Sequence, residues 1–262
     1  MNREAVRLLA RVGYASKGAV YALVGALALK AARTWSRPAG SSEALEVLNH
    51  PFLLVIGLGL VAFSLWRLVQ TVLDPDQNGT SWKGCLQRAG YAISGLVYFD
   101  LGKEALELLL ERPEPEEQKH EEEMVAVALA QPGGEWLVGL VGLAIVGLGL
   151  AQLLKAFSAS FLERLDLHKM SPGARRWTSR LAVIGLVARG LVFLLVGVTV
   201  MGSAYTLNPK DVRTIEEVFG WVRRLDQGRG LLAAVGVGFL CYGALMAIEA
   251  RYRTIGPLKV AK

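Results

Sequence analysis

Two basic residues interrupt stretches of sequence that are apolar and long enough to cross a membrane. Lys17 lies in the run from Val12 to about Ala32, and Arg189 lies in a run that begins near Leu181. Charged side chains inside a bilayer are costly and usually mark functional sites. Ammonium and guanidinium groups pair with phosphates and carboxylates, so these positions predict a site that recognises an anion.

The two cations occupy equivalent positions in a motif that the chain contains three times. The motif is Gly, four residues, Gly, six residues, Gly, with an aromatic residue three positions after the middle glycine. Ser94 occupies the equivalent position in the second copy. At about 100° per residue, this position borders the stripe of glycine and aromatic residues on one helix face. If the three helices line one axis, Lys17 and Arg189 lie at one level near the inner leaflet, with no acidic residue of the predicted spans at that depth.

We expect an anionic solute or an anionic lipid headgroup at this level, with hydroxyl contacts from Tyr14 and Tyr91. Cations without a counter-charge in a low-dielectric setting are costly, so a lipid phosphate, an anionic solute or water must solvate them. The alternative is that Lys17 and Arg189 snorkel separately to the lipid surface. Lys17 follows Arg11 by six residues, which is about 9 Å of helix, and its ammonium group can reach the inner headgroups.

Asp100 is an acidic residue within a predicted span. It aligns with Leu23 and Leu195, which are mid-span, but it falls on the face opposite the glycine stripe. Lys103 can pair with it, because residues three apart are neighbours on a helix. Alternatively, this span is shorter or shifted and Asp100 lies near the outer water. We favour the second interpretation because the next segment, KEALELLLE, is amphipathic.

The glycines of the motif predict close contacts between helices, because small residues on one face let membrane helices approach closely. The predicted packing residues are Gly18, Gly25, Gly95, Gly102, Gly190 and Gly197. The returning helix of each repeat also carries two small residues seven positions apart. These pairs are Gly57 and Ser64, Gly142 and Gly149, and Gly236 and Gly243.

These elements predict an all-α polytopic membrane protein. The composition is 53% hydrophobic, and 29 glycines are an excess typical of packed membrane helices. We predict six transmembrane helices arranged as three parallel two-helix repeats, in a single transmembrane domain of residues 1–262. The repeats span 7–76, 82–160 and 178–253, each with an amphipathic connection. Three parallel repeats favour a pseudo-threefold arrangement about the membrane normal.

The charge distribution predicts the orientation in the membrane. Outside the spans, the termini and the inter-repeat linkers carry 16 Lys and Arg residues, against 11 in the connections within repeats. The termini and inter-repeat linkers carry 6 acidic residues, and the connections within repeats carry 16. Because cations remain on the cytoplasmic side, we expect a bacterial inner membrane protein with both termini cytoplasmic. We expect Arg67, Lys155 and Glu249, near the inner ends of the returning helices, to be interfacial anchors.

Signatures of catalysis are missing from the sequence. It contains no P-loop, dinucleotide fingerprint or GxSxG elbow, and its three histidines form no metal-ligand pair. We therefore expect no enzymatic activity, no metal and no cofactor. The formal charge of +6 lies at the membrane edges without interleaved aromatic residues, so the expected partners are membrane lipids, anionic ones included, and not nucleic acids. We interpret the acidic connection 104–123 as a solvated loop.

The repeated pattern resembles a bacterial membrane family catalogued as domain of unknown function number twelve hundred and six. The first two copies match at Arg11, Gly13, Tyr14, Lys17, Gly18, Tyr21 and Gly25, and at Arg88, Gly90, Tyr91, Gly95, Tyr98 and Gly102. The third matches at Gly185, Arg189, Gly190, Phe193 and Gly197, and 249–253 resembles the end of the family's last helix. Departures are Ser94 and Val183, where basic residues are usual, and the acidic connection. The resemblance implies a fold and no activity.

Two classes of function agree with these observations. The first is a transporter or channel for a small solute or ion, which we favour because parallel repeats and buried charges occur in transporters. The second is a membrane scaffold that binds lipid or a partner without transport, and the lack of a mid-span polar cluster favours it. A continuous polar cavity that reaches Lys17 and Arg189 would support the first class, and a solid apolar core would support the second. The sequence leaves the oligomeric state open.

Overall fold

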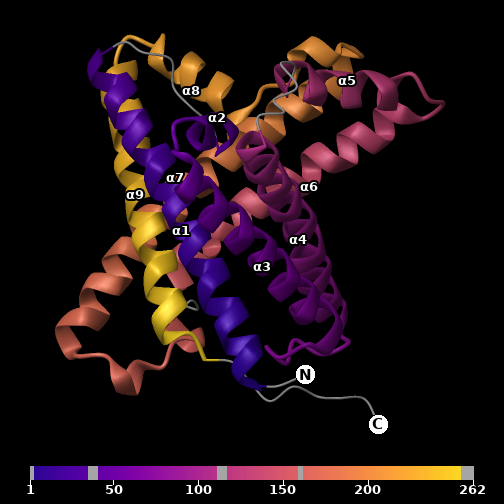
Figure 1. Cartoon of the computed structure of the whole chain (residues 1–262). Helices are drawn as coiled ribbons and strands as arrows, with labels where there is room; N and C mark the ends of the chain where they lie inside the picture. The colour runs from indigo at the N-terminus through magenta and orange to yellow at the C-terminus, as the bar shows by residue number, and fades with distance from the viewer. Residues whose placement is uncertain (1–2, 35–40, 111–116, 159–161, 255–262) are drawn as a thin grey trace.

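The computed structural model describes residues 3–34, 41–110, 117–158 and 162–254, and these form helices with no strand among them (Figure 1). The long helices of the first two repeats are α1 (Arg3–Thr34), α3 (His50–Leu73), α4 (Trp82–Leu109) and α6 (Gly134–Ser158). Those of the third repeat are α7 (Pro172–Thr206) and α9 (Gly228–Tyr252). The shorter helices α2 (Ser41–Glu46), α5 (Glu117–Leu129) and α8 (Ile215–Arg223) connect the two long helices of each repeat.

Side-chain caps fix where several helices begin. The Ser81 and Ser171 hydroxyls accept hydrogen bonds from backbone N–H groups in the first turns of α4 and α7. Thr214 and Glu217 form a capping box at the start of α8. The connection between α7 and α9 therefore contains a helix with a defined start.

Five of the six predicted spans are confirmed to be long and apolar enough to cross a membrane: α1, α3, α6, α7 and α9. Helix α4 is long enough but more polar, with Arg88 in its first half and Asp100, Lys103 and Glu107 in its second. The uncharged stretch between Arg88 and Asp100 is shorter than the about 20 residues that a span needs. That α4 also crosses the membrane stays a prediction.

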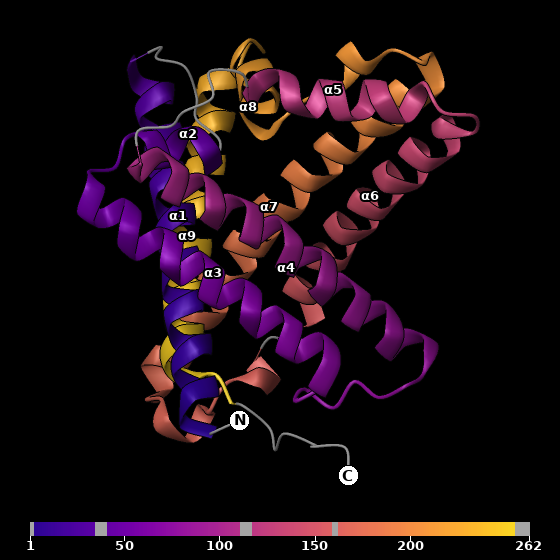
Figure 2. The ribbon, with the colours of Figure 1, turned by 45° about the vertical axis from the view of Figure 1, so that its right-hand side comes forward.

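The long helices form a ring that is open between α4 and α6, and everywhere else around it each long helix packs against the next (Figures 1 and 2). The returning helix of one repeat lies along the first helix of the next, so α3 packs on α4 and α6 packs on α7. Helix α9 joins the third repeat to the first by packing on α1. Three equivalent interfaces of this kind are the cyclic arrangement that the three parallel repeats predict. Helices α2, α5 and α8 lie at one end of the bundle, and α1 begins and α9 ends at the other. We call the end where α1 begins the inner end, and the end that carries α2, α5 and α8 the outer end.

The glycine stripes lie at these three interfaces. Gly18 and Gly25 face Gly243 and Gly236, Gly95 and Gly102 face Ser64 and Gly57, and Gly190 and Gly197 face Gly149 and Gly142. A Cβ atom at Gly18 would lie 2.9 Å from the carbonyl oxygen of Gly243, and one at Gly190 would lie 3.0 Å from that of Gly149. At Gly95 the nearest atom would be the Arg67 Cβ, at 3.2 Å. The helix backbones therefore touch where the sequence has small residues on both sides.

The second repeat differs from the other two because its hairpin is open. Within the first and third repeats α1 packs on α3 and α7 packs on α9, whereas α4 and α6 make at most marginal contact. A Cβ atom at Gly13 would lie 2.5 Å from the Phe63 Cα, and one at Gly185 would lie 2.6 Å from the Tyr242 nitrogen. At Gly90, their equivalent on α4, it would meet no atom within 4 Å. In Figures 1 and 2, α6 leans away from α4 towards the end that carries α5.

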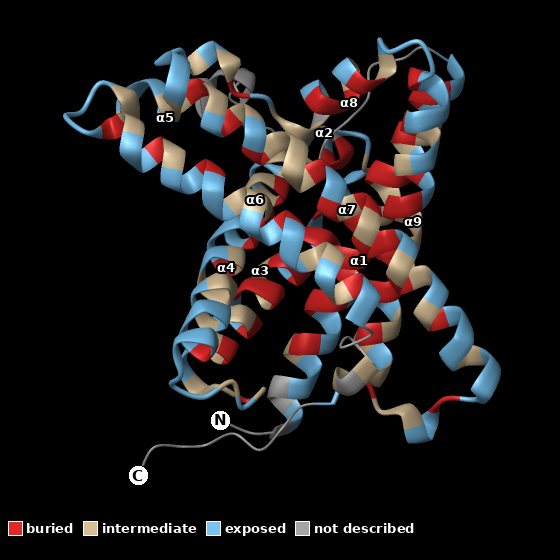
Figure 3. Ribbon diagram, turned by 180° about the vertical axis from the view of Figure 1, so that it is seen from behind, coloured by how far each residue is buried: buried red, intermediate tan, exposed pale blue. Residues whose placement is uncertain are grey.

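The core follows this asymmetry. The largest cluster of buried apolar side chains comes mainly from α1, α3, α7 and α9. In the most apolar part of α1, 56% of the residues are buried, against 17% in α6. Figure 3 shows buried residues concentrated where α1, α7 and α9 meet, and mostly exposed ones along α6. Much of the surface of α6 is therefore available to lipid.

Candidate anion-binding site

Lys17 projects from α1 into a cage of aromatic rings at the centre of the bundle. Its Nζ lies 4.7 Å from the ring centroid of Tyr98 and 4.8 Å from that of Phe63. The rings of Tyr242 and Tyr21 are at 5.6 and 5.9 Å. The side chain is 3% exposed and makes no hydrogen bond or ion pair within the described ranges. Lys17 is therefore a buried cation that aromatic faces surround and that no carboxylate directly contacts.

Arg189 projects from α7 to two of the same rings. Its Cζ lies 5.1 Å from the Tyr242 centroid and 5.3 Å from that of Tyr21, and 4.3 Å from that of Phe193. Its Nε donates a hydrogen bond of 2.8 Å to the Tyr21 hydroxyl, and the Tyr98 hydroxyl donates one of 3.1 Å to the same oxygen. The terminal guanidinium nitrogens have no hydrogen-bond partner in the part of the chain that the structure describes. The structure therefore brings Lys17 and Arg189 together.

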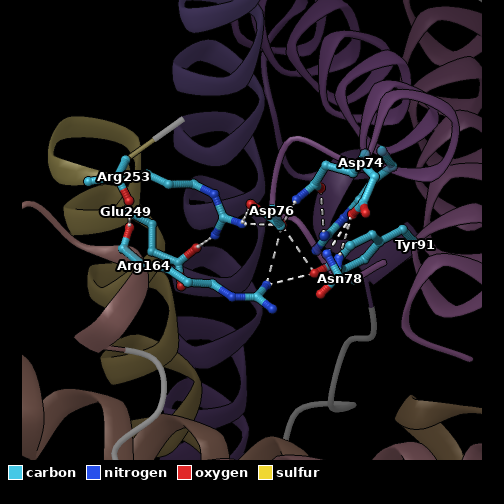
Figure 4. A network of polar contacts seen from close by, with 10 residues as sticks. Asp74, Asp76, Asn78, Tyr91, Arg164, Glu249 and Arg253 are labelled. Carbon is cyan, nitrogen blue, oxygen red and sulfur yellow. Dashed lines mark hydrogen bonds and ion pairs between the residues drawn. The ribbon is translucent and has the colours of Figure 1, made fainter. Parts of the chain in front are cut away.

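Tyr14 and Tyr91, the hydroxyl groups that the sequence predicts beside these cations, lie elsewhere. The Tyr14 ring packs edge-on against Phe63, and the Arg253 guanidinium lies 5.0 Å from the Tyr14 centroid. Tyr91 belongs to an ionic network at the inner end of the bundle (Figure 4). The part of the prediction that placed these two tyrosines at the cation pair is wrong. The reason is that both lie one helical turn before the cage position, towards the inner end.

Asp76 is the centre of the inner network (Figure 4). It accepts hydrogen bonds from Gln70, at 2.6 Å, and from the Tyr91 hydroxyl, at 3.1 Å. Arg253 pairs with it at 3.1 Å and Arg164 at 3.5 Å. Because Asp76 ends the first repeat, Arg164 follows the second and Arg253 ends the third, this cluster joins all three repeats at the inner end.

Charge pairing determines the pKa of the central carboxyl. Burial alone would raise the pKa of Asp76, but the Arg253 and Arg164 guanidinium groups and the hydrogen bonds from Gln70 and Tyr91 outweigh that effect. The pKa of Asp76 is therefore below its usual value of 3.8. The carboxylate is ionised at neutral pH.

Glu249 is not the interfacial anchor that its place near a helix end predicts. It is 6% exposed, and its carboxylate accepts a hydrogen bond of 2.9 Å from Arg253. Lys155, Lys17 and Arg67 also interact with it electrostatically. Gln70, Lys155 and Glu249 occupy equivalent positions, thirteen residues after the first small residue of each returning helix. Polar residues at one position of all three repeats are the signal from which this network could have been predicted.

Asp100 and Lys103 do not form the pair that their spacing allows. Lys103 instead makes an ion pair of 3.4 Å with Glu107, one turn further along α4, and both side chains are about half exposed. Asp100 is exposed on the surface of the bundle. The depth of Asp100 in the membrane stays a prediction.

The ring of apolar helices around buried cations defines a multi-pass α-helical membrane protein with internal repeats. The chain belongs to the family DUF1206, a domain of unknown function, whose sequence profile matches residues 12–74, 89–159 and 184–253. Each matched segment contains one copy of the glycine motif. The resemblance noted from the repeated motif is thus confirmed.

A bacterial relative covers nearly the whole chain. Uncharacterized protein YxxB of Bacillus subtilis (strain 168) is 28% identical over 253 residues, which are 95% of this chain and 91% of that protein. No solved structure matches the chain.

Proposed function

We propose that this membrane protein binds an anionic ligand, a phosphate or a carboxylate, between Lys17 and Arg189. The observation that carries this proposal is an imbalance of charge. Lys17 and Arg189 share the rings of Tyr21 and Tyr242, and among the described residues no carboxylate forms an ion pair with either cation. The carboxylate of Glu249 acts on Lys17 without contacting it. Glu249 is already paired with Arg253. An anion between Lys17 and Arg189 would supply the missing negative charge.

The aromatic cage offsets only part of the cost of burying these cations. Cation–π contacts contribute about 2 kcal/mol or more when they are desolvated, whereas removing an ion from water costs several kcal/mol in a real protein. Arg189 is prepared for an anion because Tyr21 holds its Nε, which orients the guanidinium group. A planar guanidinium binds phosphates and carboxylates through two parallel hydrogen bonds.

The packing around Lys17 favours a protein that binds an anion without transporting it. The parallel repeats alone had favoured a transporter. Aromatic contacts join Tyr14, Phe63 and Tyr98, with centroids 5.1 and 4.9 Å apart. A second series joins Tyr242 and Tyr21 to Phe239 and on to Phe219 in α8, near the outer end. A filled aromatic centre is what a membrane-embedded binding protein requires, because a transport path would need these rings to move.

Transport is the second candidate, and the open hairpin favours it. Because α4 and α6 do not pack as their equivalents do, the second repeat has room to move against the other two. Flux of radiolabelled phosphate into proteoliposomes distinguishes the candidates. Uptake above that of empty liposomes would favour transport, and Arg189-dependent binding without uptake would favour a binding protein.

The proposal includes the setting of the protein. We place it in the bacterial inner membrane with both termini in the cytoplasm, with membrane lipids as its partners and without an enzymatic step. The excess of Lys and Arg at the termini and inter-repeat linkers supports this orientation.

The test is ligand-dependent stability of the purified protein in a neutral detergent. Inorganic phosphate and dodecyl phosphate are titrated against sodium chloride at equal ionic strength, and the melting temperature is measured. A ligand that binds the folded state stabilises it by about 2.7 kcal/mol at a hundred times its Kd. We expect stabilisation of the wild type that Lys17→Gln and Arg189→Gln each abolish. Arg180→Gln removes a cation from the exposed first half of α7 and is the matched control.

Either of two results would overturn the proposal. One is that neither phosphate compound raises the melting temperature of the wild type. The other is that the Lys17→Gln, Arg189→Gln double variant responds as strongly as Arg180→Gln. A lower starting stability of the variants does not affect the conclusion, because each protein is compared with itself in chloride.

A further inference from the structure

The open hairpin of the second repeat leaves two helix faces without the partner that their equivalents have. Gly90 corresponds to Gly13 and Gly185, which touch the backbones of Phe63 and Tyr242. The residue that aligns with Phe63 and Tyr242 is Leu148 on α6, and it is 40% exposed. The contact that closes the other two hairpins is therefore missing at this position, and α4 and α6 make at most marginal contact elsewhere.

The walls of this gap are apolar. Ile93 on α4 aligns with Ser16 and Ala188, which pack against glycines of their returning helices. Ile93 is 51% exposed, and Ala144, its expected counterpart on α6, is exposed as well. In a bilayer, an apolar gap between two diverging helices is filled by lipid acyl chains, because no other component there is apolar and flexible.

The deep end of the gap is cationic. Tyr98 on α4 and Arg189 on α7 both contact the Tyr21 hydroxyl, so the inner face of α4 and the Arg189 guanidinium border the same space. Arg189 is half-buried, whereas Lys17 behind the Tyr98 ring is 3% exposed. A molecule that enters between α4 and α6 thus meets hydrocarbon first and a guanidinium with free hydrogen-bond donors next.

We propose that the gap between α4 and α6 is a lateral binding site for an anionic phospholipid. An acyl chain lies between Gly90 and Ile93 on α4 and the facing residues of α6, and the phosphate reaches Arg189 and Lys17. This inference rests on the proposed anion-binding function and identifies the source of the anion as a lipid. Two series of aromatic contacts, one from Tyr14 to Tyr98 and one from Tyr242 to Phe219, occupy the centre of the bundle, so we expect the ligand to approach from the side.

The experiment measures lipid retention by native mass spectrometry of the full-length protein. Phosphatidylglycerol and phosphatidylcholine with identical acyl chains are offered together, and the ratio of retained lipids is compared between variants. Gly90→Trp fills the gap at a position where a side chain meets no protein atom, and Arg189→Gln removes the guanidinium. The controls are Gly230→Trp, at an equally open position on α9 across the ring from the gap, and Arg180→Gln.

We expect the wild type to prefer phosphatidylglycerol and both gap variants to lose that preference by about tenfold, as the loss of charge-assisted hydrogen bonds predicts. The two controls retain it. Equal retention of the two lipids by the wild type would overturn the inference, as would an unchanged preference in Gly90→Trp.

Failure of this inference differs from failure of the proposed function. If inorganic phosphate still stabilises the protein through Arg189 while Gly90→Trp retains the lipid preference, the ligand is a soluble anion and the lateral site is wrong. If neither the stabilisation by phosphate nor the retention of phosphatidylglycerol depends on Arg189, both proposals are wrong.

Discussion

At the residue scale, Lys17 is a cation whose surroundings stabilise it incompletely. Four rings present their faces to its ammonium group, but Arg189 adds a second positive charge against two of the same rings. Two cations that share aromatic neighbours repel each other, and burial strengthens the repulsion because the interior screens charge weakly. Such an arrangement is what a ligand site requires, and it costs stability when the site is empty.

A substitution at Lys17 tests whether its buried charge lowers the stability of the ligand-free protein. We expect Lys17→Met to melt at the same or a higher temperature than the wild type in neutral detergent without phosphate or lipid. The thioether keeps the length and the aromatic contacts of lysine without the buried charge. Destabilisation by more than about 2 kcal/mol, the size of a desolvated cation–π contact, would show instead that the cage holds Lys17 as part of the structure.

Asp76 differs from Lys17 because it is a charged group with direct partners of opposite charge, Arg164 and Arg253. We expect Asp76→Asn to lower stability by roughly 3 kcal/mol at pH 7, since it leaves the half-buried Arg164 without a carboxylate and the buried Arg253 with that of Glu249 alone. The native pKa of Asp76 is depressed below 3.8. Its contribution is therefore complete above about pH 3.8 and declines as the pH falls through the native pKa.

The measurement is thermal unfolding of Asp76→Asn and wild type between pH 7 and pH 3. The stability difference should stay constant down to about pH 4 and narrow below it. Ser81→Ala, which removes a helix cap outside the network, is a control whose effect should not depend on pH in this range. A difference between Asp76→Asn and wild type that grows as the solution becomes more acidic would contradict this account.

The sequence predicted the cation pair but not its surroundings. The repeat alignment placed Lys17 and Arg189 at one level because helix geometry is regular over a few turns. Phe63 and Tyr242 were missed because they come from returning helices, whose rotation towards the axis depends on packing. Asp76 and Arg164 lie beyond the ends of α3 and α6, where no helical periodicity indicates a position.

At the element scale, one contact geometry recurs at three interfaces between repeats. A leading helix presents two glycines to two small residues of a returning helix, in antiparallel orientation, so the backbones approach closely. The sequence predicted that the glycines of the leading helices lie at helix contacts, but it did not predict which helices meet. It did not predict that the hairpin contact within the second repeat is missing, since Gly90 is present there as in the other copies.

Leucine substitutions separate the glycines that pack from those that do not. We expect Gly18→Leu and Gly190→Leu each to destabilise the protein by about 1–3 kcal/mol, because the new side chain meets a backbone carbonyl that cannot move. Gly95→Leu should cost less, since its nearest neighbour is a side-chain atom of Arg67.

Gly90→Leu is the matched control, because it changes the same type of residue in the same motif at an open position. It should leave the melting temperature within a degree or two of the wild type, or raise it slightly because leucine is the better helix former. Equal losses at Gly18, Gly90 and Gly190 would show that helix propensity, and not backbone contact, explains the glycines.

Helix α4 shows where prediction from sequence is weakest. Its glycine motif predicts a span, whereas the charges at Asp100, Lys103 and Glu107 predict an exposed outer end. The structure keeps one continuous helix over Trp82–Leu109 and packs it along α3. Both patterns are therefore present in one element, and the position of the bilayer boundary along α4 follows from neither alone.

At the scale of the whole molecule, the three repeats form an open ring, in which the last helix packs on the first and the gap lies between α4 and α6. Helices α9 and α1 are far apart in sequence, yet they make the same paired-glycine contact as the sequential pair α6 and α7. The parallel arrangement follows from the two long helices in each repeat, which the sequence predicted from the alternation of apolar runs and polar connections. Opening at α4 and α6 breaks this symmetry at one place.

The orientation of the ring in the membrane can be measured by cysteine labelling in intact cells. Starting from a variant in which Cys85 and Cys241 are replaced by alanine, single cysteines are placed at Gln131, between α5 and α6, and at Arg175, near the start of α7. Both positions are exposed. We expect a membrane-impermeant maleimide to label the first from outside and the second only after permeabilisation, because Lys and Arg residues accumulate on the cytoplasmic side. Labelling of both from the same side would contradict this topology.

The most direct test of the central claim is a structure of the protein in a lipid nanodisc that contains phosphatidylglycerol, determined by electron cryo-microscopy. The account predicts phosphate density between Lys17 and Arg189, with oxygen atoms about 3 Å from the terminal guanidinium nitrogens. It also predicts acyl-chain density between α4 and α6. A map that resolves lipid elsewhere around the bundle, but shows α4 packed on α6 and no density between the two cations, would contradict it.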